Sequence, residues 1–298
     1  ANGQEILPNY QVRYFLPDFE YFKNSYVKNV ALVDKTPHGI GWRSNRGGSG
    51  FGKWEKLPQP TVIAWARNDT WDFFAGSHDG YDDIGVKHYR KVIFLKGLGW
   101  VVRDIFESSG EEHEFQQVWQ GHYSDEGTRN HHRSAFADGS GLEILQLGGQ
   151  ADSVATSIRR GKGNLVYSMT GQNGEYITLL YPYDDFDDRI PDSFFKEGRM
   201  TAPGWTIRTT NGEETVTNGF STDARLILEH GDGVFLLGVT GFERGGQRLK
   251  FSGRSDCHLQ LLEDGSIEVV FLGHRAVRVN TPGTGEEELQ PGGSIILH

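Results

Sequence analysis

The chain has 298 residues, 36% of them hydrophobic, and a formal net charge of −10 at pH 7. This length fits one large β domain or two ordinary domains, and the hydrophobic fraction is sufficient for a sandwich core. The negative charge argues against a general polyanion binder, because nucleic acids and acidic glycans need positive surface where they touch a protein. We find no signal peptide or membrane span, although a mature secreted chain would also lack its signal. We therefore expect neither nucleic acid nor membrane as a partner.

The composition favours strands over helices. The chain has 40 glycines, 12% aromatic residues and only two methionines, which suits many short strands joined by tight turns. No long segment places apolar residues at helical spacing. We therefore predict an all-β protein, an antiparallel β-sandwich of many short strands. Because no change in composition divides the chain, we expect residues 1–298 to form a single sandwich domain.

A glycine-rich segment from Gly39 to Pro60 reads as a long loop. Its tryptophans, Trp42 and Trp54, alternate with cationic side chains that include Arg43 and Arg46. The loop is either a flexible surface loop between strands or a loop that contacts a glycan. In the second case the tryptophan rings would stack on sugar rings and the arginines would bind carboxylates. We assign Trp42, Arg43, Arg46 and Trp54 as candidate substrate-binding residues.

A second break in the strand pattern follows at Ser77-His78-Asp79-Gly80-Tyr81. Asp79-Gly80 is a turn signal, and the segment can be a turn and nothing more. His78 and Tyr81 can also serve as proton-transfer groups on a loop. They are our candidate catalytic residues.

Two apolar, β-branched runs then follow, His88 to Leu95 and Leu98 to Ile105. A three-residue loop with Gly97 in the left-handed conformation would join them into a hairpin. In that register Phe94 faces Leu98, and His88 faces Asp104.

The pair of His88 and Asp104 has two interpretations. It is either a cross-strand hydrogen bond between two half-buried polar groups or part of a metal site, since imidazole nitrogen and carboxylate oxygen are normal zinc ligands. A zinc site needs a third ligand, for which His113 and His122 are the candidates. If the chain turns at Ser108-Ser109-Gly110 into a third strand, hairpin geometry favours His113.

The remaining sequence continues the strand pattern to the C-terminus. We expect His131 and His132 in a solvated loop, since neighbouring residues on a strand point to opposite faces and cannot easily share a metal. The single cysteine, Cys257, excludes an intrachain disulfide, and we expect it to be a small buried apolar residue.

Several of these motifs together resemble one family. The run H-x-R-x-V from His88, the W-V-V-x-D from Trp100, and a later aromatic strand with His113, Trp119 and His122 are similar to the C-terminal β-sandwich of heparinase II/III-like polysaccharide lyases. The segments 25–35 and 222–240 also resemble the family. Lys28 and Phe115 depart from it, because the family usually has histidine and several members have tyrosine at these positions.

The resemblance implies a function and a set of ligands. Members cleave uronate-containing polysaccharides by β-elimination and often carry a structural zinc, which implies His88, Asp104 and a later histidine as ligands. On resemblance we rank His122 above His113. Most catalytic residues of the family lie in a preceding α/α toroid, which this chain lacks. The resemblance also implies an acidic polysaccharide or oligosaccharide as partner and a periplasmic or secreted location. The alternative is a non-catalytic glycan-binding or structural module.

Overall fold

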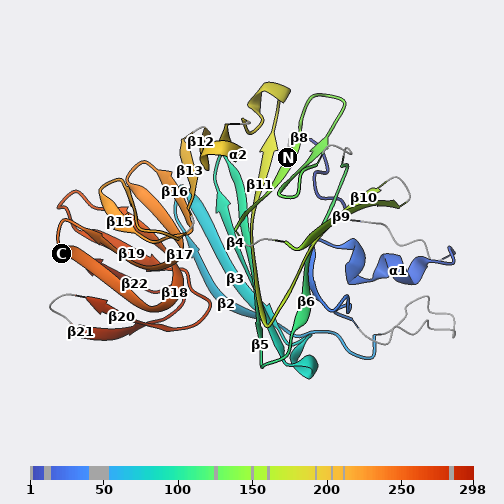
Figure 1. Ribbon diagram of the computed structural model, residues 1–298, viewed down its shortest axis with the longest axis horizontal. Coiled ribbons are helices and arrows are strands. Elements are labelled where there is room, and N and C mark those ends of the chain that lie inside the picture. The colour runs from blue at the N-terminus through green and yellow to red at the C-terminus, as the bar shows by residue number, and fades with distance from the viewer. Residues whose placement is uncertain are drawn as a thin grey trace. The chain divides into compact units, whose positions relative to one another are not determined.

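The computed structural model describes residues 3–9, 15–39, 54–123, 127–148, 151–159, 162–191, 193–202, 204–210, 212–281 and 285–298. The described chain is mostly β-structure, with antiparallel sheets in a sandwich-like arrangement (Figure 1). The predicted all-β fold is confirmed. No helix among these residues is long and apolar enough to cross a membrane.

The described strands form three sheets. In order across the first sheet, the strands are β1 (Val30–Val33), β6 (His113–Gly121), β10 (Lys162–Gly171) and β9 (Ser153–Arg159). The second sheet contains β2 (Pro60–Arg67), β3 (Trp71–His78), β4 (Val86–Leu95), β5 (Gly99–Ser108), β11 (Asn173–Tyr183), β8 (Gly141–Gly148) and β7 (His131–Ala135).

The third sheet is built by the C-terminal part of the chain. Its main path contains β12 (Arg199–Ala202), β13 (Trp205–Thr209), β16 (Leu226–His230), β17 (Gly233–Arg244), β18 (Gln247–Leu261), β19 (Ile267–Phe271) and β22 (Ser294–Leu297). Beside that path lie β14 (Thr215–Thr217), β15 (Phe220–Thr222), β20 (Val277–Thr281) and β21 (Gly285–Leu289). The helical segments are short: α1 (Phe19–Lys23), α2 (Phe194–Glu197), η1 (Ser25–Val27), η2 (Asp82–Ile84) and η3 (Phe186–Asp188).

The chain divides into two compact units. Unit 1 comprises Ala1–Thr61, Gly76–Arg90 and Val101–Arg189, and unit 2 comprises Val62–Ala75, Lys91–Trp100 and Ile190–His298. The strands β2 to β5 contribute residues to both units, so the division follows neighbours in space and not one boundary in the chain. That residues 1–298 form a single domain stays a prediction.

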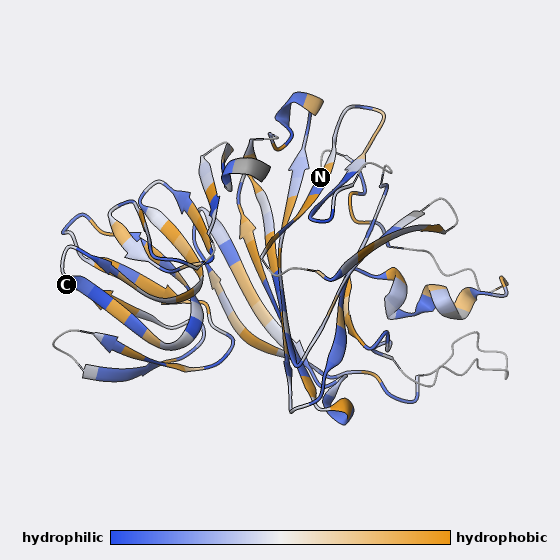
Figure 2. Ribbon diagram, viewed as in Figure 1, coloured by the Kyte–Doolittle hydropathy of each residue, from blue (hydrophilic) through white to orange (hydrophobic). Residues whose placement is uncertain are grey.

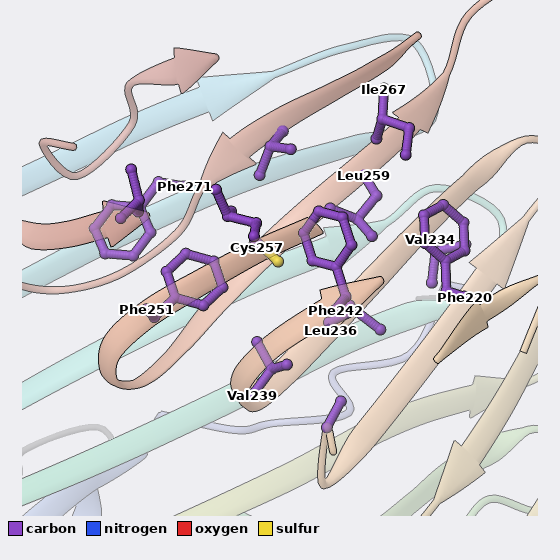
Figure 3. Packing of buried hydrophobic residues seen from close by; sticks show 14 of the residues in the cluster. Phe220, Val234, Leu236, Val239, Phe242, Phe251, Cys257, Leu259, Ile267 and Phe271 are labelled. Atoms are coloured by element: carbon purple, nitrogen blue, oxygen red, sulfur yellow. The ribbon is translucent and has the colours of Figure 1, made fainter. Parts of the chain in front are cut away.

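Alternation of apolar and polar residues explains the core of unit 2. Hydrophobic and hydrophilic residues alternate along many of its strands (Figure 2), which places every second side chain on one face of the sheet. The apolar faces of β17, β18 and β19 meet in one cluster, where Cys257 lies among Phe251, Leu236 and Phe271 (Figure 3). Burial raises the pKa of the Cys257 thiol well above its usual value, with a further contribution from Asp256. Cys257 is thus a buried residue, as expected.

The strand β6 is the centre of the four-stranded sheet in unit 1. It pairs with β10 along its whole length and with β1 over four residues, in both cases without a shift in register, for example Val118 with Val166 and Val30. Because successive side chains of an unbroken strand point to opposite faces, Gln117 and Gln120 lie on opposite faces of this sheet.

The hairpin of β4 and β5 forms, but its turn is shorter than the predicted three-residue loop. The Leu98 amide donates to the Leu95 carbonyl at 3.0 Å, so the turn is two residues long, with Gly97 at φ 80°. The ring of Phe94 stacks on that of Trp100, and the ring of His88 stacks on that of Phe106. In the predicted pairing, Phe94 and His88 would instead face Leu98 and Asp104. His88 also reaches Asp104, so the predicted meeting of these two residues is confirmed.

The prediction of a solvated loop at His131 and His132 is also wrong. Both residues belong to β7, which pairs with β8. His132 is buried, and its Nδ1 atom lies 3.0 Å from the hydroxyl of Tyr167. As neighbours on a strand they point to opposite faces, and on the other face His131 Nε2 lies 3.5 Å from Oε1 of the buried Glu143.

Candidate active site: a buried histidine and carboxylate network

Asp104 on β5 is the centre of the network and is 0% exposed. Its Oδ1 lies 2.8 Å from His88 Nε2 and accepts from Arg90 Nε at 2.7 Å. Its Oδ2 accepts from Arg90 Nη2 at 2.8 Å and from Gln117 Nε2 at 2.7 Å. Both carboxylate oxygens are therefore occupied, by a two-point guanidinium pair and two further donors.

These partners decide the charge of Asp104. Burial alone would raise the pKa of this carboxyl, but the positive charge of Arg90 and the hydrogen bonds from His88 and Arg90 hold it well below its usual range. Asp104 is thus a buried carboxylate that stays ionised because a cation and two polar side chains replace its water.

The network continues from His88 to His78 at the end of β3. His88 Nδ1 lies 3.2 Å from His78 Nε2, and the Gly80 amide donates to His78 Nδ1 at 3.0 Å. An amide N–H can only donate, so Nδ1 of neutral His78 accepts and its proton is on Nε2. His78 then donates to His88, which in turn donates through Nε2 to Asp104. The order of donors is fixed from Gly80 to the carboxylate.

A third histidine, His38, adjoins His78. The ring centroids of His38 and His78 lie 4.8 Å apart, and His38 Nε2 donates to the Ala31 carbonyl at 2.8 Å. Burial, with the charges of His88 and His38 adding to it, lowers the pKa of His78 to about 3. Burial also lowers the pKa of His38 to about 4, despite its hydrogen bond to Ala31. Both rings are therefore neutral at pH 7.

Tyr81 lies beside these histidines and is almost fully buried, at 1% exposed. Its ring contacts His78 and His38 with centroids 5.4 and 5.5 Å away. The hydroxyl donates to the Thr36 carbonyl at 3.1 Å, and burial raises the pKa of Tyr81. The predicted catalytic pair is thus brought together with His88 and Asp104, but the Tyr81 hydroxyl is directed at the backbone. A catalytic role for His78 and Tyr81 stays a prediction.

The two candidates for the third metal ligand have other neighbours. His122 is exposed, and its ring lies 5.3 Å from that of Phe136. His113 is buried, with Nδ1 2.7 Å from Asp34 Oδ2. Among the described residues, no group of three or more His, Cys, Asp or Glu side chains is arranged to hold a metal ion.

These contacts test whether a zinc ion fits. The oxygens of Asp104 already accept from Arg90, His88 and Gln117, and a dication at the carboxylate would have to displace the guanidinium or lie beside it. His88 uses both ring nitrogens. The observed arrangement fits a hydrogen-bonded network and does not fit a zinc held by His88, Asp104 and His122 or His113. The zinc itself stays a prediction.

The candidate substrate-binding residues are only partly described. Trp42, Arg43 and Arg46 lie outside the described residues. Trp54 is half-buried, and its ring lies against Gly39, where a Cβ atom would come within 2.8 Å of Trp54 Cε3. Gly39 and Trp54, both within the predicted loop, therefore meet, and a side chain at position 39 would push the indole away.

Sequence reasoning missed several members of the network. Arg90 lies two residues after His88, so strand alternation places it on the same face, and that signal was available. It also donates through Nη1 to the Asn29 carbonyl at 2.7 Å. Gln117, a polar residue between Phe115 and Trp119 on a buried face, was a second usable signal. His38 lies outside any strand, and no local pattern indicated it.

Comparison with known proteins supports the fold. No protein-family model and no curated protein sequence matches the chain. Among solved structures, it is similar to a mutant of the heparan sulfate lyase HepC from Pedobacter heparinus, with a TM-score of 0.52 and 15% identity over 76% of this chain and 33% of that one. A second match is a heparinase III, the BT4657 gene product, with a TM-score of 0.51 and 13% identity over 77% of this chain and 33% of that one.

The chain therefore spans about a third of the length of the solved structures that it matches. At these identities the likeness concerns the fold. The fold of this chain resembles a portion of a heparinase II/III-type lyase.

Proposed function

We propose that the chain is the β-sandwich portion of a heparinase II/III-like polysaccharide lyase, acting on uronate-containing glycans by β-elimination in the periplasm or outside the cell. The fold likeness to the heparan sulfate lyase HepC carries the proposal. The buried network around Asp104 supports it, because a rigid, ordered set of titratable groups is typical of functional sites.

The reaction sets three requirements. A base removes the proton at C5 beside the uronate carboxylate, an acid protonates the leaving glycosidic oxygen, and neutral or cationic groups counter the charge that develops on the carboxylate. A base needs a free lone pair, yet both ring nitrogens of His78 are engaged, by Gly80 and by His88. In the observed arrangement, His78 is oriented by its neighbours and not poised to take a proton.

We therefore assign a positioning role to Asp104, Arg90 and His88. Arg90 keeps Asp104 ionised, Asp104 holds the tautomer and orientation of His88, and His88 holds His78. In the proposal, the groups that abstract and return the proton belong to an α/α toroid outside this chain, and no step uses a zinc ion. The partners are thus an acidic polysaccharide and a helical domain.

The proposal is tested with heparin, heparan sulfate, alginate and hyaluronan. The chain alone should form no unsaturated uronate product, as measured by ultraviolet absorbance. It should still bind a heparan sulfate oligosaccharide in titration calorimetry, more weakly as salt increases. Product formation by the chain alone, lost in His78→Ala or Tyr81→Phe, would make the Ser77 to Tyr81 segment catalytic instead.

A non-catalytic glycan-binding or structural module is the second candidate. The closed set of hydrogen bonds around Asp104 favours it, because the network uses its polar atoms internally, as a structural element would. The sequence encoded upstream of Ala1 separates the two candidates: a long helical pattern supports the lyase, and its absence supports the independent module.

A further inference from the structure

Aromatic side chains gather on one face of the strands β2 to β5, which are neighbours in the second sheet. The opposite face of β3 and β4 is turned towards the third sheet, because Trp71 and Lys91 both contact residues of that sheet. Side chains alternate along a strand, so Phe74 on β3 and Phe94 on β4 point away from the third sheet.

Two ring contacts extend this face to the neighbouring strands. Trp65 on β2 meets Phe74 edge to face, with ring centroids 5.9 Å apart, and Trp100 on β5 stacks on Phe94 with centroids 5.2 Å apart. Rings in contact across neighbouring strands share a face of the sheet. Trp65, Phe74, Phe94 and Trp100 therefore form one aromatic platform, and all four residues belong to unit 2.

The aromatic platform is accessible to a ligand. Trp65 is 63% exposed, and the other three rings are half-buried. Contiguous apolar surface of this kind is typical of interaction sites. Four rings that are already partly covered leave on the order of a few hundred Å² free, which is less than the roughly 800 Å² that each partner contributes to a stable protein–protein interface. The platform therefore suits a small rigid ligand better than a second protein.

A cation beside the platform indicates what else the ligand carries. Arg67 follows Trp65 by two residues on β2, so its side chain lies on the same face, roughly 7 Å further along the strand. Arg67 is exposed and forms no ion pair with a described residue. Lys96, in contrast, is paired with Asp72 at 3.3 Å, and Asp69 belongs to the turn that follows β2. Arg67 can therefore pair with an anionic group of a ligand.

From these observations we propose that the aromatic platform binds a uronate residue of a glycan chain. The apolar face of the sugar ring lies on Trp65, because the hydrogens of its C–H bonds are slightly positive and meet the negative face of the indole. The carboxylate pairs with Arg67, whose guanidinium can donate two parallel hydrogen bonds. The choice of sugar rests on the proposed function. The residues involved belong neither to the loop from Gly39 to Pro60 nor to the network around Asp104.

The test uses the full chain and titration calorimetry with hexasaccharides of hyaluronan and of heparan sulfate, and with a neutral glucose hexasaccharide as the uncharged comparison. Trp65→Ala removes the stacking surface. Val62→Ala is the matched control, because Val62 is 69% exposed on the same strand and points to the opposite face. Arg67→Gln removes the positive charge and keeps a polar side chain.

We expect at least one acidic hexasaccharide to bind the parent, with an affinity that falls at least about fivefold in Trp65→Ala and is unchanged in Val62→Ala. Arg67→Gln should weaken binding of the acidic chain and reduce the dependence of its affinity on salt. The neutral hexasaccharide should bind more weakly than the acidic one. If circular dichroism shows that Trp65→Ala does not fold, the exposed variant Arg67→Gln decides alone.

The proposal is overturned if neither acidic hexasaccharide binds, if Trp65→Ala or Arg67→Gln binds like the parent, or if Val62→Ala loses as much affinity as Trp65→Ala. It is also overturned if sedimentation shows dimers of the parent that Trp65→Ala abolishes, which would make this face a contact between copies of the chain. Product formation and the upstream sequence test the lyase proposal without involving Trp65, so either proposal can fail while the other stands.

Discussion

The Nδ1 atom of His88 lies 3.2 Å from the Nε2 atom of His78. One proton lies between the two nitrogens, and a second one at this contact would set two N–H groups against each other and break the hydrogen bond. Protonation of the network therefore opposes its folded geometry, which has consequences for stability.

The first prediction concerns pH. The folded pKa values of His78 and His38 are lowered, to about 3 and about 4, from 6.5. Between these values and 6.5 the unfolded chain binds more protons than the folded chain, so stability rises with pH in this window. We expect these two residues to make a constant contribution to the free energy of unfolding above pH 6.5. That contribution should be lost progressively, by on the order of a few kcal/mol, as the pH falls towards 3.

Urea unfolding at a series of pH values measures this loss. The variant His78→Gln removes one of the groups, so its free energy of unfolding should depend less steeply on pH. His122→Gln is the control, because this ring is exposed, and it should follow the parent curve. If the free energy of unfolding depends on pH equally steeply in the parent and in His78→Gln, the prediction is contradicted.

The second prediction concerns Asp104→Ala. The substitution leaves Arg90 and His88 without their carboxylate in a buried site, and breaking such a pair costs about 3–5 kcal/mol. Asp82→Ala is the control: its ion pair with Lys87 is exposed, so its loss should cost less than about 1 kcal/mol. Chemical denaturation measures both, and similar losses in the two variants would show that the network contributes little.

The third prediction concerns zinc. Because the oxygens of Asp104 and the nitrogens of His88 are engaged, we expect a chelator to leave the melting temperature unchanged. Elemental analysis of protein purified without chelators provides the second measurement. One equivalent of zinc, lost in Asp104→Ala and kept in His122→Ala, would instead show a metal at this network with a different third ligand.

The fourth prediction concerns a buried ion pair in unit 2. Lys91 Nζ lies 2.7 Å from Asp256 Oδ2, with the two residues 3% and 1% exposed, and the Gly238 amide donates to Asp256 Oδ1. Lys91→Met leaves the carboxylate buried without its cation and should cost about 3–5 kcal/mol. Lys87→Met, at an exposed pair, should cost less than about 1 kcal/mol. A loss of that small size in Lys91→Met would mean that the pair is dispensable.

The fifth prediction concerns the loop from Gly39 to Pro60. If its cations contact the glycan, replacing both Arg43 and Arg46 by alanine should weaken binding of a heparan sulfate oligosaccharide and reduce the dependence of affinity on salt. Titration calorimetry at two salt concentrations measures both effects. Unchanged affinity would identify the loop as surface without a role in binding.

Local patterns were sufficient to predict the strands and the meeting of His88 with Asp104. Alternation fixes the face on which each side chain lies, and this was sufficient to bring His88 and Asp104 onto one face. The same rule would have placed Arg90 beside Asp104, had it been applied to the guanidinium as well as to the imidazole.

Contacts between distant parts of the chain were not predictable in this way. Lys91 and Asp256 are 165 positions apart, and no local signal in either strand indicates the other. His38 joins the network from outside the strands, where no period applies. The contact of His113 with Asp34 is a similar case, because no hairpin rule describes it, and the third metal ligand stays a prediction.

Cys257 gives the molecule a built-in reporter. It is the only thiol of the chain and is fully enclosed in the core of unit 2, so a thiol reagent can reach it only when that core opens. The rate of labelling under native conditions therefore measures the opening of one unit without any substitution. Compared with the unfolding of the whole chain followed by circular dichroism, this rate would show whether the two compact units open together or one at a time.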